Sequence, residues 1–213
     1  MSRGRGYEWT ICKELSLAFT NGKREDVFSP TDTSGARATM RKKAGKTTEG
    51  QHGDITYNDP IGKPLIDLWN CECKIGYGTK RKNKEGIVKT NWCVLDLIDS
   101  QQKETQLESF WKQCCRDAEI TKREPVLIFR RNNRSTCIAF RTNYFGDPEE
   151  DYGPYIYLSN LDIFIFNFKE FLKSINFDFI INPLKDRGNE EKTEEIETTC
   201  KPKTSRKKQL LRV

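Results

Sequence analysis

Hydrophobic residues recur at helical spacing in two parts of the chain. Over residues 7–20 one face carries Ile11, Cys12, Leu15, Ala18 and Phe19, and Asn21-Gly22 follows as a stop signal. Over residues 104–119 one face carries Leu107, Phe110, Trp111, Cys114 and Ala118. The spacing predicts an amphipathic helix over each segment.

Short apolar runs between polar segments predict the strands. We expect strands at 27–28, 53–59 and 65–77, and a hairpin of residues 126–131 and 135–141 around Asn132-Asn133. The nearly continuous apolar run 126–131 is typical of a strand that is buried on both faces. Residues 155–181 are dense in Ile, Phe and Leu, and 168–175 are expected to be helical. The order of helix, strands, helix and strands indicates an α/β or α+β core.

Polar segments divide the chain. Two glycine-containing basic loops are expected at 30–53 and 76–86. We expect a single domain over residues 1–184, with a core at 6–141 and an aromatic-rich extension at 142–184. From residue 185 the apolar content collapses, which predicts a charged, disordered tail over 185–213.

Composition narrows the function classes. The 213 residues include 37 Lys and Arg against 31 Asp and Glu, a net charge of +6 that favours an anionic partner. The basic start MSRGRGYEW has no apolar stretch after it, and no apolar run reaches transmembrane length. We therefore expect a cytoplasmic protein, and in that compartment its eight cysteines should be reduced. Only one histidine is present, His52, which argues against histidine triads and histidine-rich zinc sites.

Asp54, Glu72 and Lys74 are the residues with the clearest chemistry. In a strand, alternate residues share a face, so Glu72 and Lys74 emerge together while Cys71 and Cys73 face the core. If the strand that holds Asp54 pairs with this one, two carboxylates and an ammonium converge. Hard oxygen ligands suit Mg²⁺, which activates water for phosphodiester hydrolysis without histidine. The alternative is a turn residue at Asp54 beside an exposed cross-strand ion pair.

Glu8 lies on the apolar face of the first predicted helix. A carboxylate on a buried stripe is costly unless a metal or polar cluster faces it. Glu8 also stands in the first helical turn, where a negative charge favours the helix dipole. Both interpretations remain open from the sequence.

The order of these motifs resembles a known nuclease superfamily. Its elements are Glu8, Ser34-Gly35, Gly53-Asp54-Ile55, Glu72-Cys73-Lys74, and later residues 110–113, 116–118 and 125–129. Over residues 6–141 this order is similar to the PD-(D/E)xK nucleases, most of all to the archaeal-type Holliday-junction-resolving branch and phage-type relatives. Gly53 stands where the superfamily often has proline.

The resemblance implies an α/β restriction-endonuclease-like core, with a central mixed sheet flanked by helices. It implies metal ligation by Glu8, Asp54, Glu72 and the backbone carbonyl of Cys73. It also implies Mg²⁺ as cofactor, with Mn²⁺ able to substitute, Lys74 beside the attacking water and Ser34 near the scissile phosphate. Gln113 stands at the edge of an apolar helix face, so we leave it outside the predicted site.

Two basic clusters adjoin the predicted site in sequence, and we expect them to bind DNA phosphates. They are Arg37, Arg41, Lys42, Lys43 and Lys46, and then Lys80, Arg81, Lys82 and Lys84. We therefore expect an endodeoxyribonuclease acting on branched or duplex DNA, as a homodimer with its interface in 155–181. The alternatives are a non-cleaving DNA-binding module of the same fold and a sequence-specific restriction enzyme.

Overall fold

A five-stranded sheet forms the centre of the protein. The computed structural model describes residues 3–31, 53–76, 81–83, 86–88, 104–145 and 152–181. The strands of the sheet are β3 (Trp69–Gly76), β6 (Glu124–Arg131), β7 (Cys137–Arg141), β8 (Tyr155–Leu158) and β9 (Ile163–Asn167). Their order across the sheet is β3-β6-β7-β9-β8. Only β3 and β6 run parallel, so the expected mixed sheet is confirmed.

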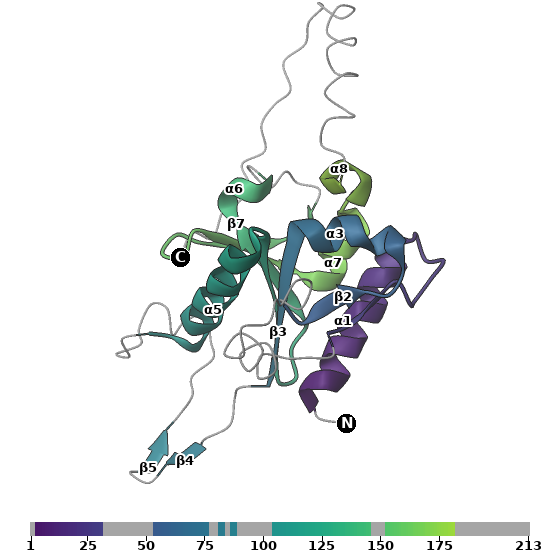
Figure 1. Ribbon diagram of the computed structural model, residues 1–213. Coiled ribbons are helices and arrows are strands. Elements are labelled where there is room, and N and C mark those ends of the chain that lie inside the picture. Colours follow the sequence, from purple (N-terminus) through teal and green to yellow (C-terminus); the bar gives the residue numbers. More distant parts are fainter. Residues whose placement is uncertain are drawn as a thin grey trace, which may run out of the picture.

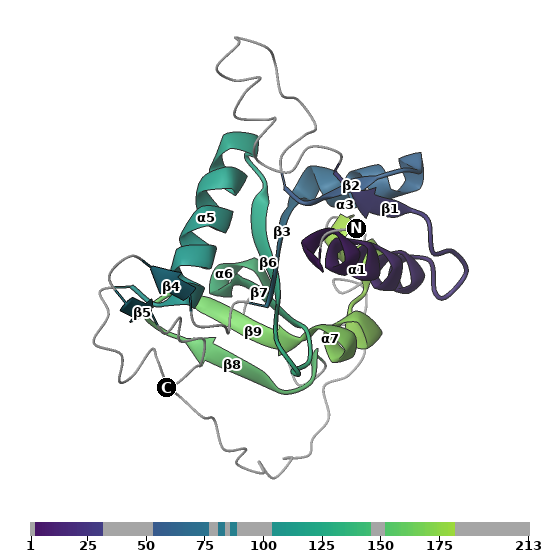
Figure 2. The same cartoon turned by 90° about the horizontal axis from the view of Figure 1, so that it is seen from below.

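Helices cover both faces of this sheet (Figures 1 and 2). One face packs on α1 (Arg3–Phe19), α3 (Lys63–Leu68) and α7 (Phe168–Ser174), and the opposite face packs on α5 (Gln106–Thr121). Two short helices, α6 (Thr142–Phe145) and α8 (Phe177–Ile181), complete the helical elements of the described residues. The helices predicted over 7–20 and 104–119 are therefore confirmed as α1 and α5.

Strand β6 is buried on both faces, as its apolar run predicts. Val126 and Ile128 join the core on the α1 side, and Leu127 and Phe129 join the core on the α5 side. Because side chains alternate along a strand, an unbroken apolar run supplies both cores at once.

The termini of the two long helices follow from local sequence. Thr105 and Glu108 form a capping box at the start of α5. At the end of α1 the N–H of Gly22 donates to the carbonyl of Leu17 over 2.7 Å, with Gly22 at φ +80°. A residue without Cβ adopts this left-handed backbone most easily, so α1 ends where the sequence predicts.

Two strand predictions are corrected. The segment 65–77 begins as helix α3, and β3 starts only at Trp69. Pro64 stands in the first turn of α3, where a missing N–H costs nothing, and Leu65 and Ile66 bury on the α1 side. In the segment 53–59, only Ile55–Tyr57 form a strand, β2, which pairs with β1 (Phe28–Pro30).

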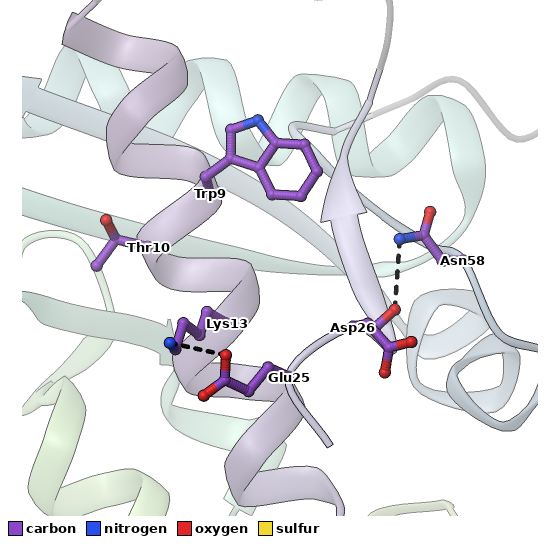
Figure 3. A pocket seen from close by; sticks show the side chains of 6 residues that line it. All are labelled: Trp9, Thr10, Lys13, Glu25, Asp26 and Asn58. Atoms are coloured by element: carbon purple, nitrogen blue, oxygen red, sulfur yellow. Dashed lines mark hydrogen bonds and ion pairs between the residues drawn. The ribbon is translucent and has the colours of Figure 1, made fainter.

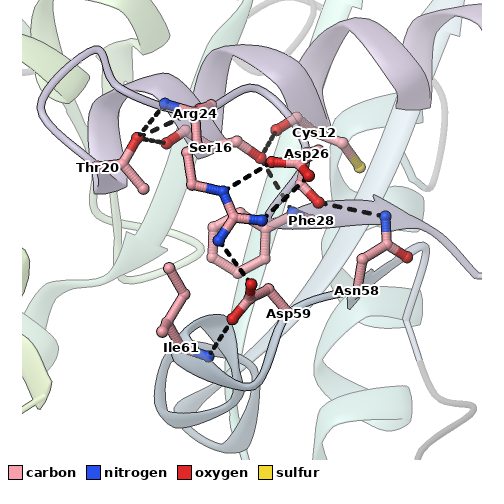
Figure 4. A network of polar contacts seen from close by, with 9 residues as sticks. All are labelled: Cys12, Ser16, Thr20, Arg24, Asp26, Phe28, Asn58, Asp59 and Ile61. Carbon is pink, nitrogen blue, oxygen red and sulfur yellow. Dashed lines mark hydrogen bonds and ion pairs between the residues drawn. The ribbon is translucent and has the colours of Figure 1, made fainter.

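Polar contacts fix β1 against α1 (Figure 4). The hydroxyl of Ser16 donates to the carbonyl of Cys12 over 2.7 Å and accepts from the N–H of Phe28 over 3.0 Å. The guanidinium of Arg24 lies between Asp26 and Asp59, at 2.9 and 2.6 Å. The β1–β2 pair is thereby held beside the helix that carries Glu8.

The segment after residue 141 belongs to the central sheet. Strands β8 and β9 extend it, and Phe164, Phe166, Phe168 and Phe171 are buried in the chain's own core. Most aromatic surface that we assigned to a dimer interface is therefore used within the fold. The predicted tail, 185–213, lies outside the described residues.

A short 3₁₀ turn (Pro60–Gly62) precedes α3, and β4 (Arg81–Asn83) pairs with β5 (Gly86–Val88). None of the helices described has the length and apolar character needed to cross a membrane.

Candidate active site

Asp54 is bound to the free edge of β3. Its N–H donates to the carbonyl of Cys71 over 2.7 Å, and its carboxylate accepts from the N–H of Cys73, also over 2.7 Å. These bonds take the place of a strand pairing between the Asp54 segment and β3, because β2 pairs with β1. The N–H and C=O of one strand residue point to the same side, so the Cys73 carbonyl faces the side of Asp54.

Thr31 holds the other side of this segment. Its N–H donates to the carbonyl of Asp54 and its hydroxyl donates to the carbonyl of Gly53, each over 3.0 Å. The guanidinium of Arg5 on α1 donates to the Thr31 carbonyl over 3.2 Å. The backbone around Asp54 is therefore fixed both by the residue that follows β1 and by β3.

Gly53 is required by the geometry beside Asp54. Its φ is +82°, and a Cβ placed there would lie 2.9 Å from the carbonyl oxygen of Cys71. Proline holds φ near about −65°, so the residue that the superfamily often uses does not fit this backbone. Glycine, in place of the superfamily's frequent proline, therefore goes with a backbone conformation at position 53 that proline cannot adopt.

Glu72 and Lys74 share one face of β3, as the strand period predicts. The Glu72 carboxylate is 5% exposed and pairs with the Lys74 ammonium, which also lies 5.7 Å from the ring centroid of Phe110. Cys71 and Cys73 are buried on the opposite face, toward α1. The alternative of an exposed surface ion pair is wrong, because both side chains are largely buried.

Gln113 belongs to this site, although sequence reasoning left it out. Its side-chain amide donates to Glu72 Oε1 over 2.8 Å. The position of Gln113 at the edge of the apolar face of α5 was the available signal, because that edge faces β3. Asp117 lies one turn further along α5, and its charge contributes to raising the pKa of both Asp54 and Glu72.

The pKa values of both carboxylates of the site, Asp54 and Glu72, are raised. Burial raises the pKa of Asp54 and of Glu72 well above the usual range of a carboxyl. The charge of Asp54 raises the pKa of Glu72 further, whereas the Lys74 ammonium lowers both. One ammonium against the half-buried Asp54 and the buried Glu72 leaves a net negative site, which a divalent cation would neutralise.

Glu8 reaches the same region from the other face of β3. Burial raises its pKa, Glu72 adds to the rise, and Arg5 and Lys74 oppose it. Within the described part of the chain, no three His, Cys, Asp or Glu side chains are arranged to hold a metal ion. The charge of Glu8 also raises the pKa of Asp54, so the three carboxylates lie near enough to interact, and metal ligation by Glu8, Asp54 and Glu72 stays a prediction.

Most of the predicted DNA-binding residues lie outside the described residues. These are Ser34, Arg37, Arg41, Lys42, Lys43, Lys46, Lys80 and Lys84. Arg81 and Lys82 belong to β4, whose side chains are not described. Their contacts with DNA stay predictions.

A hollow of about 600 Å³ lies away from this site, between α1 and the segment before β1 (Figure 3). It is lined by Trp9, Thr10, Lys13, Glu25, Asp26 and Asn58. An ion pair between Lys13 and Glu25, at 2.7 Å, crosses part of it. The hollow shares no lining residue with the Asp54 site.

Comparison with known protein families gives a match over most of the chain. The model of the family described as "Phage putative PDDEXK endonuclease" matches residues 1–182. No curated protein and no solved structure matches the chain. The matched range includes every element of the central sheet and the Asp54, Glu72 and Lys74 positions.

Proposed function

The chain belongs to the phage putative PDDEXK endonuclease family, a family with the restriction-endonuclease-like α/β fold, and we propose that it is a Mg²⁺-dependent endodeoxyribonuclease. Its substrate would be branched or duplex DNA, cut as in Holliday-junction resolvases. The observation that carries the proposal is the pair of the half-buried Asp54 and the buried Glu72 beside Lys74, at the free edge of β3.

The residues present fit a magnesium ion. Mg²⁺ is usually held by one or two carboxylates, with water and substrate phosphate completing the coordination. Asp54 and Glu72 would hold it, the Cys73 carbonyl faces the same side as Asp54, and the half-buried Glu8 adds negative charge from α1. When bound, Mg²⁺ supplies an activated water and neutralises phosphoryl charge, and Mn²⁺ would substitute.

The chain's own residues orient the remaining groups. Lys74 and Gln113 both engage Oε1 of Glu72, which holds this carboxylate in one orientation. The Lys74 ammonium, only 13% exposed, is placed to stabilise negative charge on a phosphoryl oxygen and to orient the attacking water. A low-exposure site strengthens this electrostatic contribution.

The remaining parts of the proposal rest on the resemblance. Resolving a junction requires two cuts, so two active sites in a homodimer would act together. The basic segments around 35–46 and 80–84 would bind backbone phosphates. A chain that binds DNA without cutting it would instead be a DNA-binding module of this fold.

The test is cleavage of a labelled four-way junction beside linear duplex of the same sequence, with Mg²⁺, with Mn²⁺ and with a chelator. Wild type should cut only with metal. Asp54→Asn and Glu72→Gln should lose at least about a hundredfold in rate while retaining DNA binding. Asp178→Asn, the same chemical change at an exposed residue of α8, is the matched control. Metal-dependent cleavage that survives both site variants would refute the proposal.

A further inference from the structure

Three arginines surround the tip of the hairpin between β6 and β7. The N–H of Arg134 donates to the carbonyl of Arg131 over 3.2 Å, which closes a turn through Asn132 and Asn133. Arg131 and Arg134 are exposed, and Arg130 is half-buried. In the described ranges, none of the three arginines forms an ion pair with a carboxylate. The tip therefore carries positive charge that no carboxylate of the described residues pairs with.

The strand register places this tip beside the candidate active site. In the parallel pair of β3 and β6, Lys74 is opposite Phe129 and Gly76 is opposite Arg131. Paired residues share a face, so Arg131 lies on the face of Lys74 and about 7 Å further along the strand direction. Gly76 has no side chain, so β3 places no side chain next to Arg131 on this face.

Arg130 anchors the hairpin from the opposite face. Its guanidinium lies 5.1 Å from the ring centroid of Tyr7, on α1, directly before Glu8 in the sequence. A cation over an aromatic face is an attractive contact. The hairpin tip, the end of β3 and the first turns of α1 therefore lie at one end of the molecule. In Figure 1 the end of β3 and the first turns of α1 are seen in the lower part of the view.

We propose that Arg131 and Arg134 bind backbone phosphates of the DNA strand next to the bond that is cut. This inference rests on the proposed nuclease function. The carboxylates of Asp54, Glu72 and Asp117 repel a phosphate strand, so cations beside them are needed to hold it. Exposed guanidinium groups match phosphate oxygens in geometry and charge.

The experiment measures binding separately from cleavage. In an Asp54→Asn background, fluorescence anisotropy gives the Kd of labelled duplex over a salt series for Arg131→Gln/Arg134→Gln. Loss of two phosphate contacts should lower the slope of log affinity against log salt by about 1.8, at about 0.9 per contact. Lys122→Gln/Lys173→Gln removes the same charge at two exposed positions, the C-cap of α5 and α7, and should leave the slope nearly unchanged.

The outcomes separate the two proposals. A folded arginine variant with the parent slope and affinity, alongside a wild type that cuts DNA, would overturn the hairpin assignment alone. A wild type that neither binds nor cuts DNA with Mg²⁺ or Mn²⁺ would overturn both. Circular dichroism checks the fold, and the single Arg134→Gln variant, expected to lower the slope by about 0.9, serves if the double variant does not fold.

Discussion

The N–H of Cys73 donates to the carboxylate of Asp54 over 2.7 Å, which joins the residue before β2 to the middle of β3. The exposed edge of a sheet normally offers unpaired backbone groups to any other chain. Here those groups position a carboxylate instead. Asp54 is thereby brought beside Glu72, which precedes Cys73 on the same strand.

Removing the amide of Gln113 should slow cleavage. A hydrogen bond to a charged group contributes about 1.5–3 kcal/mol, so Gln113→Ala should lose about tenfold to a hundredfold in rate, because Glu72 loses a partner that orients it. Gln113→Glu should lose more, since it sets a second carboxylate against Glu72. The neighbouring Lys112→Ala, at an exposed position of α5, is the control. Equal rates for all four proteins would exclude this role.

Asp54→Asn should stabilise the metal-free protein at neutral pH. Burial raises the pKa of Asp54 to about 6, so its favourable contribution to folding is present at low pH and is lost as pH rises through about 6. Asparagine has no ionisable group, so its contribution to folding is not lost as the pH rises. Its side-chain oxygen can still accept from the Cys73 N–H.

Thermal unfolding with a chelator should therefore show the Asn variant more stable at pH 7.5, by on the order of 1–3 kcal/mol, with little difference at pH 4.5. Added Mg²⁺ should stabilise wild type and not the variant. A variant that is less stable at pH 7.5 would contradict the electrostatic account of this site.

Gly53→Ala should damage both stability and cleavage. A non-glycine residue in this backbone region costs about 1–3 kcal/mol, and the added Cβ would press on the Cys71 carbonyl that holds Asp54. Gly22→Ala is a matched control, because Gly22 also has positive φ but no atom near its Cβ position. Urea unfolding and cleavage rates should show a larger stability loss for Gly53→Ala, and a loss of activity only there.

Glu8→Ala distinguishes a metal-site role from a helix-terminus role. Because burial raises the pKa of Glu8, its removal should leave thermal stability unchanged or higher while weakening Mg²⁺ binding by calorimetry and slowing cleavage. Glu14→Ala, on the same helix at a residue that pairs with Lys169 of α7, should change neither metal binding nor rate. If stability instead fell by about 0.3–1 kcal/mol with metal affinity intact, Glu8 would act only on the helix dipole.

Local periodicity was sufficient for the elements that carry the site. The helical spacing of Ile11, Leu15 and Phe19 predicted α1, and the apolar run 126–131 predicted β6. Glu72 and Lys74 were placed on one face because alternation along a strand is a property of the extended backbone alone. Such features depend on residues a few positions apart, so they can be read directly from the chain.

Tertiary packing decided how these elements meet. The sequence could not show that β2 pairs with β1, that Asp54 hydrogen-bonds to Cys73 of β3, or that α5 turns Gln113 toward Glu72. Nor could it show that β8 and β9 complete the sheet, or that Arg131 follows Lys74 on one face. Each of these depends on contacts between segments far apart in sequence, whose free energy comes from packing the whole core rather than from any local pattern.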